Sequence, residues 1–159
     1  METISRLDVR GPGWYWNNIT VGEHTGTHFD APVHWVTGRD LPNNTTDTLD
    51  VQKLVAPACV IDCSADAADN GDYLLRVPVL EAWEARHGKI PAGNWVLFRT
   101  DWSRRSGAAY ANVLEDGAHT PGPDAEAVRF LVDRGGLGFG VETIGTDAGQ
   151  AHLMEPMYP

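Results

Sequence analysis

The sequence predicts an α/β fold with at least partly parallel strand pairing. Between Ala58 and Val141, short apolar segments typical of strands alternate with segments of helical periodicity. This alternation is typical of strand–helix–strand crossovers. The chain has 159 residues, a length that favours one domain and allows about 68–70% of the unfolded surface to be buried. We therefore expect a single domain over residues 1–159.

The first regular elements are expected in the middle of the chain. Ala58–Cys63 is a short apolar segment with the character of a strand. A helix is expected at Val79–His87, because Pro78 stands at its start and Gly88 lies just past its end. The segment Trp95–Thr100 follows a turn-forming Pro-Ala-Gly-Asn sequence and is expected to be a strand.

The clearest helix is expected at Asp124–Arg134. Asp124 suits the start of a helix, and Gly135 suits its end. A strand at Leu137–Val141 is expected to follow. The apolar residues that share one face of the predicted helix are Ala125, Val128, Leu131 and Val132.

The first third of the chain, up to about Leu54, has a different character. It is rich in Gly, Asn, Thr, His and Trp and shows no helical period. We expect a strand at Asn18–Glu23 that leads into a polar, turn-rich loop. No recognisable element closes the sequence at either end, so the prediction is a domain truncated at both ends.

Composition excludes several functional classes. Lys and Arg number 12 against 22 Asp and Glu, which gives a formal net charge of −10. This balance argues against binding to a nucleic acid or to an anionic membrane. There is no apolar run of about 20 residues as a membrane span needs, and the N-terminus lacks the apolar core of a secretory signal. The sequence therefore predicts a cytoplasmic protein.

The two cysteines are expected to be buried core residues rather than a disulfide. Cys59 and Cys63 lie four positions apart, and along an extended strand their Cα atoms would be about 13 Å apart. A disulfide tolerates roughly 7 Å. Free cysteine is among the most frequently buried residue types. A redox or metal-binding pair is the alternative.

The segment His24-Thr-Gly-Thr-His-Phe-Asp-Ala-Pro-Val-His34 concentrates the groups that carry chemistry. Its polar members are His24, His28, Asp30 and His34, all at even positions. Side chains alternate along an extended chain, so all four would emerge on one face. A helix is a poor alternative, because Thr-Gly-Thr has low helix propensity and Pro32 lacks a donor. The other interpretation is a surface loop whose histidines only cap turns.

The spacing of these residues favours a metal site. On a straight strand the Cα atoms of His24 and His28 would be about 13 Å apart, and Gly26 permits a bend that shortens this distance. With Asp30, the histidines offer three ligands and leave coordination positions for water and substrate. Imidazole and carboxylate suit zinc, manganese or iron. His34 could be a fourth ligand, but we favour it as a general base or acid.

The segment HTGTHFDAPVH resembles the signature of the cyclase family of metal-dependent hydrolases, which includes bacterial kynurenine formamidases and isatin hydrolases. The resemblance implies a swivelling β/β/α domain with a mixed, barrel-like sheet flanked by helices. It also implies that His24, His28 and Asp30 bind a divalent metal, zinc or manganese, and that His34 is catalytic. Members of the family typically form homo-oligomers whose interfaces contribute to the substrate pocket.

A second segment, RGGLGFGVETIGTDAG, resembles the family more weakly. Glu142 and Asp147 fall near acidic positions of the family and could bind substrate, although a salt-bridged or turn-capping role is an equal alternative. Kynurenine formamidases use a later His and Glu for a second metal, but His152 and Glu155 match neither their position nor their spacing. We therefore expect a one-metal site, or a site completed by residues absent from this chain.

Tryptophans are further candidates for substrate binding, because aromatic faces stack well on planar ligands. Trp35, directly after His34, is the strongest of the four candidates, and the others are Trp14, Trp16 and Trp102. Core packing or a subunit interface is the alternative for each. His119, in a loop rich in Gly and Pro, is expected to be exposed to solvent.

Together these features predict a metal-dependent hydrolase, similar to arylformamidases, of a small amide, formamide or lactam C–N bond. Metal-activated water would attack the carbonyl, and His34 would carry the proton to the leaving nitrogen. The expected partner is a small carbonyl-containing substrate, in a homo-oligomer that binds neither nucleic acid nor membrane. One alternative is a non-catalytic, cyclase-like protein that binds a metal or ligand. The other is a closed structural metal site.

Overall fold

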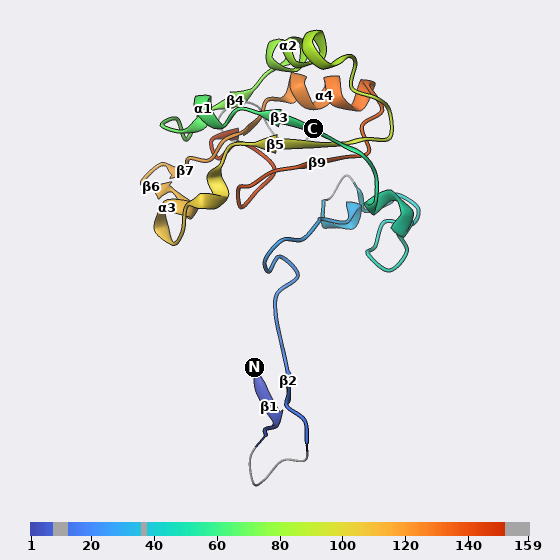
Figure 1. Ribbon diagram of the computed structural model, residues 1–159, viewed down its shortest axis with the longest axis vertical. Coiled ribbons are helices and arrows are strands. Elements are labelled where there is room, and N and C mark those ends of the chain that lie inside the picture. The colour runs from blue at the N-terminus through green and yellow to red at the C-terminus, as the bar shows by residue number, and fades with distance from the viewer. Residues whose placement is uncertain (8–12, 36–37, 152–159) are drawn as a thin grey trace. The chain divides into compact units, whose positions relative to one another are not determined.

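The computed structural model describes residues 1–7, 13–35 and 38–151 (Figure 1). The chain forms two compact units, Met1–Asp50 and Val51–Pro159, and each is described here by itself. A single domain over residues 1–159 stays a prediction.

The second unit is built around a three-stranded parallel sheet. Its strands are β3 (Ala58–Asp62), β5 (Trp95–Arg99) and β9 (Gly138–Gly140), in the order β3-β5-β9. Every pairing in this sheet is parallel. Helices α2 (Val77–His87) and α4 (Ala125–Asp133) lie on the same side of it (Figure 1). The predicted α/β fold with parallel pairing is therefore confirmed.

The core lies between the helices and one face of the sheet. Side chains alternate along a strand, so Cys59 and Ile61 of β3 are buried while Val60 between them is 47% exposed. Both cysteines are free and buried, as predicted. The other members of this core are Cys63, Leu75, Leu80, Ile90, Val96, Phe98, Ala127 and Leu131.

Local chemistry explains where the two long helices begin and end. The Asp124 carboxylate accepts a hydrogen bond from the Ala127 amide at 2.8 Å, which caps α4 as the sequence predicted. Gly88 follows α2 with a φ of +87°, a conformation that glycine adopts without steric cost. Arg134 donates two hydrogen bonds to Glu84, at 2.8 and 2.9 Å, and joins the helices. This pairing lowers the pKa of Glu84 to about 2.

The apolar face predicted for α4 is only partly the buried face. Ala127 and Leu131 are buried, whereas Val128 is 43% and Val132 is 68% exposed. Periodicity located the apolar stripe but did not show which part of it the sheet covers.

Shorter elements complete the two units, and none of the helices in the described ranges is long and apolar enough to cross a lipid bilayer. In the first unit, β1 pairs antiparallel with β2. In the second, β4 pairs parallel with β8, and β6 pairs antiparallel with β7. Their bounds are β1 Glu2–Ser5, β2 Trp16–Asn18, β4 Leu74–Leu75, β6 Val113–Leu114, β7 Gly117–Ala118 and β8 Gly122–Pro123, with short helices η1 Pro32–His34, η3 Val51–Leu54, α1 Ser64–Ala67, η4 Trp102–Arg104 and α3 Ala108–Ala111.

Two expectations about strands are wrong. The sheet is not barrel-like, because no sheet closes on itself among the described residues. The strand expected at Asn18–Glu23 lies earlier, since β2 ends at Asn18 and residues 19–23 belong to no strand. Pairing with β1 decides this position, because Glu2 faces Asn18 and no partner strand continues past it.

His119 is not exposed as expected, because two carboxylates hold its ring. Nδ1 lies 2.8 Å from an Asp72 oxygen, and Nε2 lies 3.0 Å from an Asp116 oxygen. The side chain is 15% exposed. Hydrogen bonds from the ring to Asp116 and then Asp72 raise the pKa of His119. The charged ring thereby ties the β6–β7 turn to the loop before β4.

This arrangement predicts that the contribution of His119 to the free energy of unfolding depends on pH. A raised folded-state pKa means that the stabilisation is fully present below the unfolded-state pKa of about 6.5 and is lost as the pH rises through the raised value. The difference in urea midpoint between the unmodified protein and His119→Gln should therefore be largest near pH 5.5 and should shrink toward pH 8.5. His87→Gln, which removes a histidine from α2, is the control. A difference that does not change with pH would contradict this interpretation.

Candidate metal centre

The histidine-rich segment lies in the first unit and is bent rather than extended. Gly26 has a φ of +70°, in the left-handed region that glycine adopts without steric cost. The chain therefore reverses between His24 and His28, and the predicted bend at Gly26 is confirmed. The single face that an extended chain would give the four side chains is not formed, because residues 23–27 are turn and bend and His34 belongs to the 3-10 helix η1.

Three donor atoms converge after this reversal. His24 Nδ1 lies 3.0 Å from His28 Nε2 and 3.1 Å from Asp30 Oδ1. The third separation, from His28 Nε2 to Asp30 Oδ1, is 3.4 Å. Ligands bound about 2.1 Å from one ion at angles near 90–110° lie roughly 3.0–3.4 Å from each other. The spacing therefore fits three ligands on adjacent coordination positions of one metal ion, and these residues form a candidate metal group.

The orientation of His28 supports this interpretation. Its Nδ1 lies 2.8 Å from the carbonyl oxygen of Gly26, which can only accept a hydrogen bond, so the ring proton is on Nδ1. In the neutral ring, Nε2 then presents its lone pair toward Asp30 and His24. A hydrogen bond from the second ring nitrogen is the usual way in which proteins orient a metal-binding histidine.

The chemistry of this donor set fits a divalent cation. With neutral rings, a carboxylate oxygen and an imidazole lone pair face each other, and a cation between them would remove their repulsion. The side chains of His24, His28 and Asp30 are 48%, 28% and 26% exposed. Three ligands at a partly exposed site leave coordination positions for water or substrate.

His34 lies beside the three-residue group but is not part of it. Its ring centroid is 4.5 Å from that of His24, with the rings tilted by 57°. The Trp35 ring lies edge-on to His34 at 5.0 Å. The His34 ring therefore lies next to the ligand candidate His24, and the Trp35 ring lies next to His34.

One residue that supports this loop was missed by the sequence analysis. The Asn44 side chain donates to the carbonyl oxygens of Gly38 and Arg39, at 2.9 and 2.8 Å. The backbone carbonyl of Asn44 accepts a hydrogen bond from the Val33 amide at 3.0 Å. Asn44 thus braces the backbone next to His34. Nothing in the sequence distinguishes it, because it stands in a polar run typical of any turn.

The predicted tryptophans have different environments. Trp16 lies on β2 and is 52% exposed. Trp102 lies in the second unit and is 1% exposed. Its indole N–H donates to the Tyr110 carbonyl at 2.8 Å, and the Arg105 guanidinium covers the ring at 3.7 Å. This burial favours core packing for Trp102 over the predicted contact with substrate.

Glu142, also in the second unit, is held by hydrogen bonds to the segment that follows β5. Its carboxylate accepts from the Thr100 amide at 2.7 Å and from the Ser103 hydroxyl at 2.8 Å. Burial opposes its ionisation, but these hydrogen bonds outweigh that effect and lower the pKa of Glu142. This environment favours the capping alternative, because the carboxylate is already engaged.

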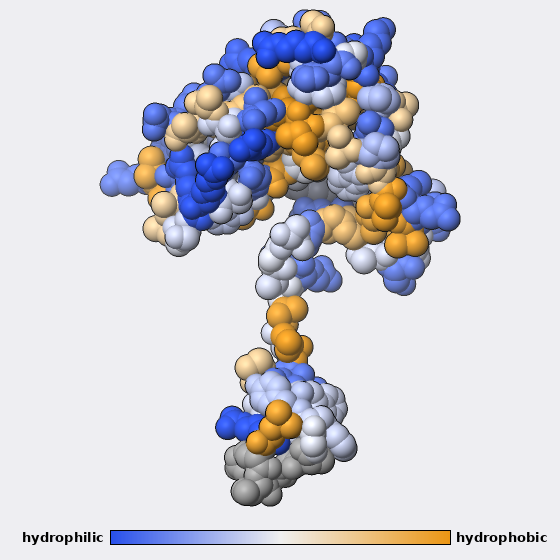
Figure 2. Space-filling view, viewed as in Figure 1, coloured by the Kyte–Doolittle hydropathy of each residue, from blue (hydrophilic) through white to orange (hydrophobic). Residues whose placement is uncertain are grey.

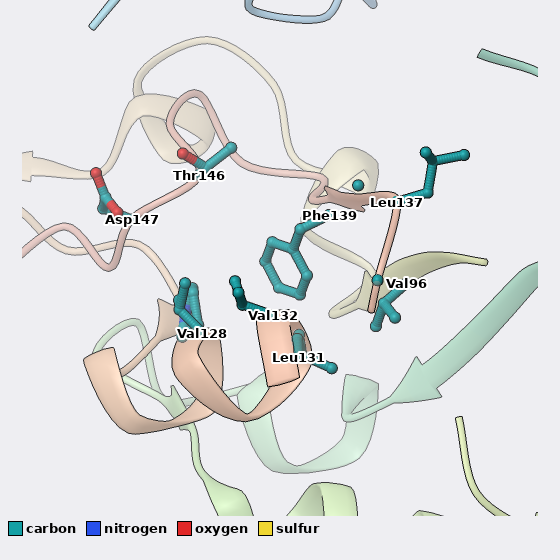
Figure 3. Close-up of a pocket in the computed structure, with 11 residues that line it drawn as sticks. Val96, Val128, Leu131, Val132, Leu137, Phe139, Thr146 and Asp147 are labelled. Carbon is teal, nitrogen blue, oxygen red and sulfur yellow. The ribbon is translucent and has the colours of Figure 1, made fainter. Parts of the chain in front are cut away.

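The environment of Asp147 raises the pKa of its carboxyl, whereas that of Glu142 lowers it. It lies with Thr146 at one side of a cavity in the second unit, across from the side chains of α4 (Figure 3). Burial raises the pKa of the Asp147 carboxyl. His152 and Glu155, which were given no role, lie outside the described residues.

Comparison with known proteins places the chain in a family. The family model described as "Putative cyclase" matches residues 3–148. Isatin hydrolase from Roseibium aggregatum is 52% identical over an alignment of 161 positions, which covers 100% of this chain and 61% of that relative. This chain therefore spans about three-fifths of the length of that relative.

Solved structures give the same result. Isatin hydrolase A from Ralstonia solanacearum is 61% identical with a TM-score of 0.95, covering 99% of this chain and 61% of that chain. An isatin hydrolase bound to the product analogue thioisatinate is 52% identical with a TM-score of 0.94 and the same coverage. The family match extends over both units and includes the segment that holds the candidate metal centre. This chain belongs to the cyclase family.

Proposed function

We propose that this chain carries the metal-binding and proton-transfer groups of a hydrolase that opens a cyclic amide C–N bond. The observation that carries the proposal is the convergence of three donor atoms within 3.0–3.4 Å of one another in the family's signature segment. The 52% identity to isatin hydrolase supports isatin as the first substrate to test.

In this mechanism His24, His28 and Asp30 hold a divalent ion. When bound, the ion would polarise the substrate carbonyl and lower the pKa of a water molecule, which makes that water a better nucleophile once its proton is removed. Asp30 supplies negative charge to the ligand set, and the Gly26 carbonyl keeps the Nε2 lone pair of His28 directed at the site.

His34 is proposed to move the proton. Its ring lies 4.5 Å from the His24 ring, close enough to serve a water molecule held at the site. An imidazole can both accept and donate a proton near neutral pH, so His34 can take the proton from the attacking water and deliver it to the leaving nitrogen. Trp35 contacts His34 and offers an aromatic surface for a planar substrate. Trp16, which lies in the same unit, is a further proposed contact with substrate.

The proposal also covers the metal, the substrate, the cellular compartment and the oligomeric state. Zinc and manganese are both proposed as the metal, because mixed imidazole and carboxylate ligands suit either. The substrate is a small carbonyl compound, the protein acts in the cytoplasm, and it works as a homo-oligomer.

Metal binding gives the first test. The chain should bind about one equivalent of Zn²⁺ or Mn²⁺, and His28→Ala should weaken binding by more than about 100-fold, because changes in the outer shell alone reach 10–100-fold. Calorimetric titration of the metal-free protein measures this. His87→Ala, a histidine substitution on α2, is the matched control. If His28→Ala bound the metal with unchanged affinity, the assignment of His28 as a ligand would be wrong.

Hydrolysis gives the second test. His34→Ala should lower kcat for isatin hydrolysis by about 10²–10⁴-fold, the usual contribution of general acid–base catalysis, with its metal content unchanged. Absorbance of the ring-opened product and elemental analysis measure the two quantities. Loss of metal in His34→Ala would identify a fourth ligand instead. Full metal occupancy without hydrolysis of isatin, formamides or lactams would favour a non-catalytic metal-binding protein.

A further inference from the structure

The proposed proton carrier, His34, lies on an element that has little core beneath it. Helix η1 is a 3-10 helix of three residues, and such short helices have poorer hydrogen-bond geometry than an α-helix. In the described part of the first unit, Ala31 is the one buried hydrophobic residue. Ile19 and Val21 are 68% and 64% exposed, and Figure 2 shows apolar side chains at the surface of this unit. Hydrogen bonds rather than core packing must therefore hold η1 in place.

Asn44 supplies hydrogen bonds of this kind from a later part of the chain. Its side-chain amide nitrogen donates to the carbonyl oxygens of Gly38 and Arg39, and its backbone carbonyl accepts from the Val33 amide. Both hydrogens of the amide nitrogen are thereby used. A flipped amide would turn the side-chain oxygen toward two carbonyl oxygens, so only one orientation of Asn44 fits. Asn44 therefore joins η1 and the segment after it into one hydrogen-bonded loop.

Two backbone features bring the partners of this loop together. The Gly38 amide donates to the Trp35 carbonyl at 2.9 Å. A Cβ atom at Gly38 would collide with the carbonyl oxygen of Pro32, so only glycine allows the two backbones to approach this closely. Asn43 has a φ of +53°, a left-handed conformation that costs free energy and is tolerated by Asn and Asp better than by most residues. The turn at Asn43 directs the next residue, Asn44, toward the Gly38 carbonyl.

We propose that Asn44 is a positioning residue for His34, because it fixes the backbone that holds the His34 ring beside the His24 ring. The inference rests on the proposed function, in which His34 moves a proton. The two ring centroids are 4.5 Å apart, and a proton carrier must lie within hydrogen-bond reach of the group it serves. A shift of η1 by about 1 Å would disturb this reach. The metal ligands should be unaffected, because the three hydrogen bonds of Asn44 end on residues 33, 38 and 39.

The substitution Asn44→Asp in the full chain tests this role. It keeps the size of the side chain but turns a carboxylate oxygen toward the Gly38 and Arg39 carbonyls. The kcat for isatin hydrolysis should fall by about 10–100-fold, the scale expected for a displacement of about 1 Å, while KM and the affinity for Zn²⁺ stay as in the control. Asn43→Asp is the matched control, because it makes the same change of charge at the neighbouring, exposed residue. Loss of Zn²⁺ affinity together with kcat would indicate general unfolding of the loop and overturn the positioning role.

A double-variant cycle distinguishes this inference from the proposed function itself. In the His34→Ala background, Asn44→Asp should change kcat by less than about twofold, because residues that act through one another are not additive. An equal loss of kcat in both backgrounds would show that Asn44 does not act through His34. If His34→Ala lowers kcat but Asn44→Asp matches Asn43→Asp, the inference fails and the proposed function stands. Full activity of His34→Ala would instead contradict the proposed function.

Nuclear magnetic resonance of the metal-free protein tests the positioning without any measurement of activity. The unmodified chain and Asn43→Asp should show a nuclear Overhauser cross-peak between the His34 and His24 rings, and Asn44→Asp should lose it. The Val33 amide, which donates to the Asn44 carbonyl, should also exchange its hydrogen faster in Asn44→Asp. These results are expected whether or not the chain hydrolyses isatin. A cross-peak or a Val33 exchange rate that Asn44→Asp leaves unchanged would overturn the inference.

Discussion

The candidate metal centre depends on the left-handed backbone at Gly26. Its φ of +70° reverses the chain, so that His24 and His28, four positions apart, bring their ring nitrogens within 3.0 Å. A side chain at this position would cost roughly 1–2 kcal/mol in that conformation. The reversal also turns the Gly26 carbonyl toward His28, so one backbone geometry both joins two ligands and fixes the ring proton of one of them.

The two units are stabilised by different forces. Residues of Val51–Pro159 form a core in which the sheet packs against two helices. In contrast, Ala31 is the one buried hydrophobic residue among the described residues of Met1–Asp50. Hydrogen bonds such as those of Asn44 therefore carry much of the local order near the site. A metal ion that binds only the folded loop would stabilise this unit further.

Local patterns predicted the elements whose signals are contained within a few residues. Asp124 and Gly135 mark the two ends of α4, because helix capping depends on contacts between residues that are close in the sequence. The parallel sheet followed from the alternation of strands and helices. The predictions that were wrong concern features that long-range contacts determine. His119 looked exposed in its loop, yet Asp72, 47 positions away, holds its ring.

The sequence by itself determined which groups can bind a metal, since His24, His28 and Asp30 stand at a spacing that a single bend can close. It also determined both ends of α4, the C-terminal end of α2 and the parallel character of the sheet, whereas α2 begins at Val77 and not at the expected Val79. Only the tertiary structure decided that the donor atoms meet at 3.0–3.4 Å, that Trp102 is buried, and that α4 leaves two valines exposed. The physical reason is that ligand convergence and burial depend on contacts between distant segments, which periodicity and spacing along the chain do not encode.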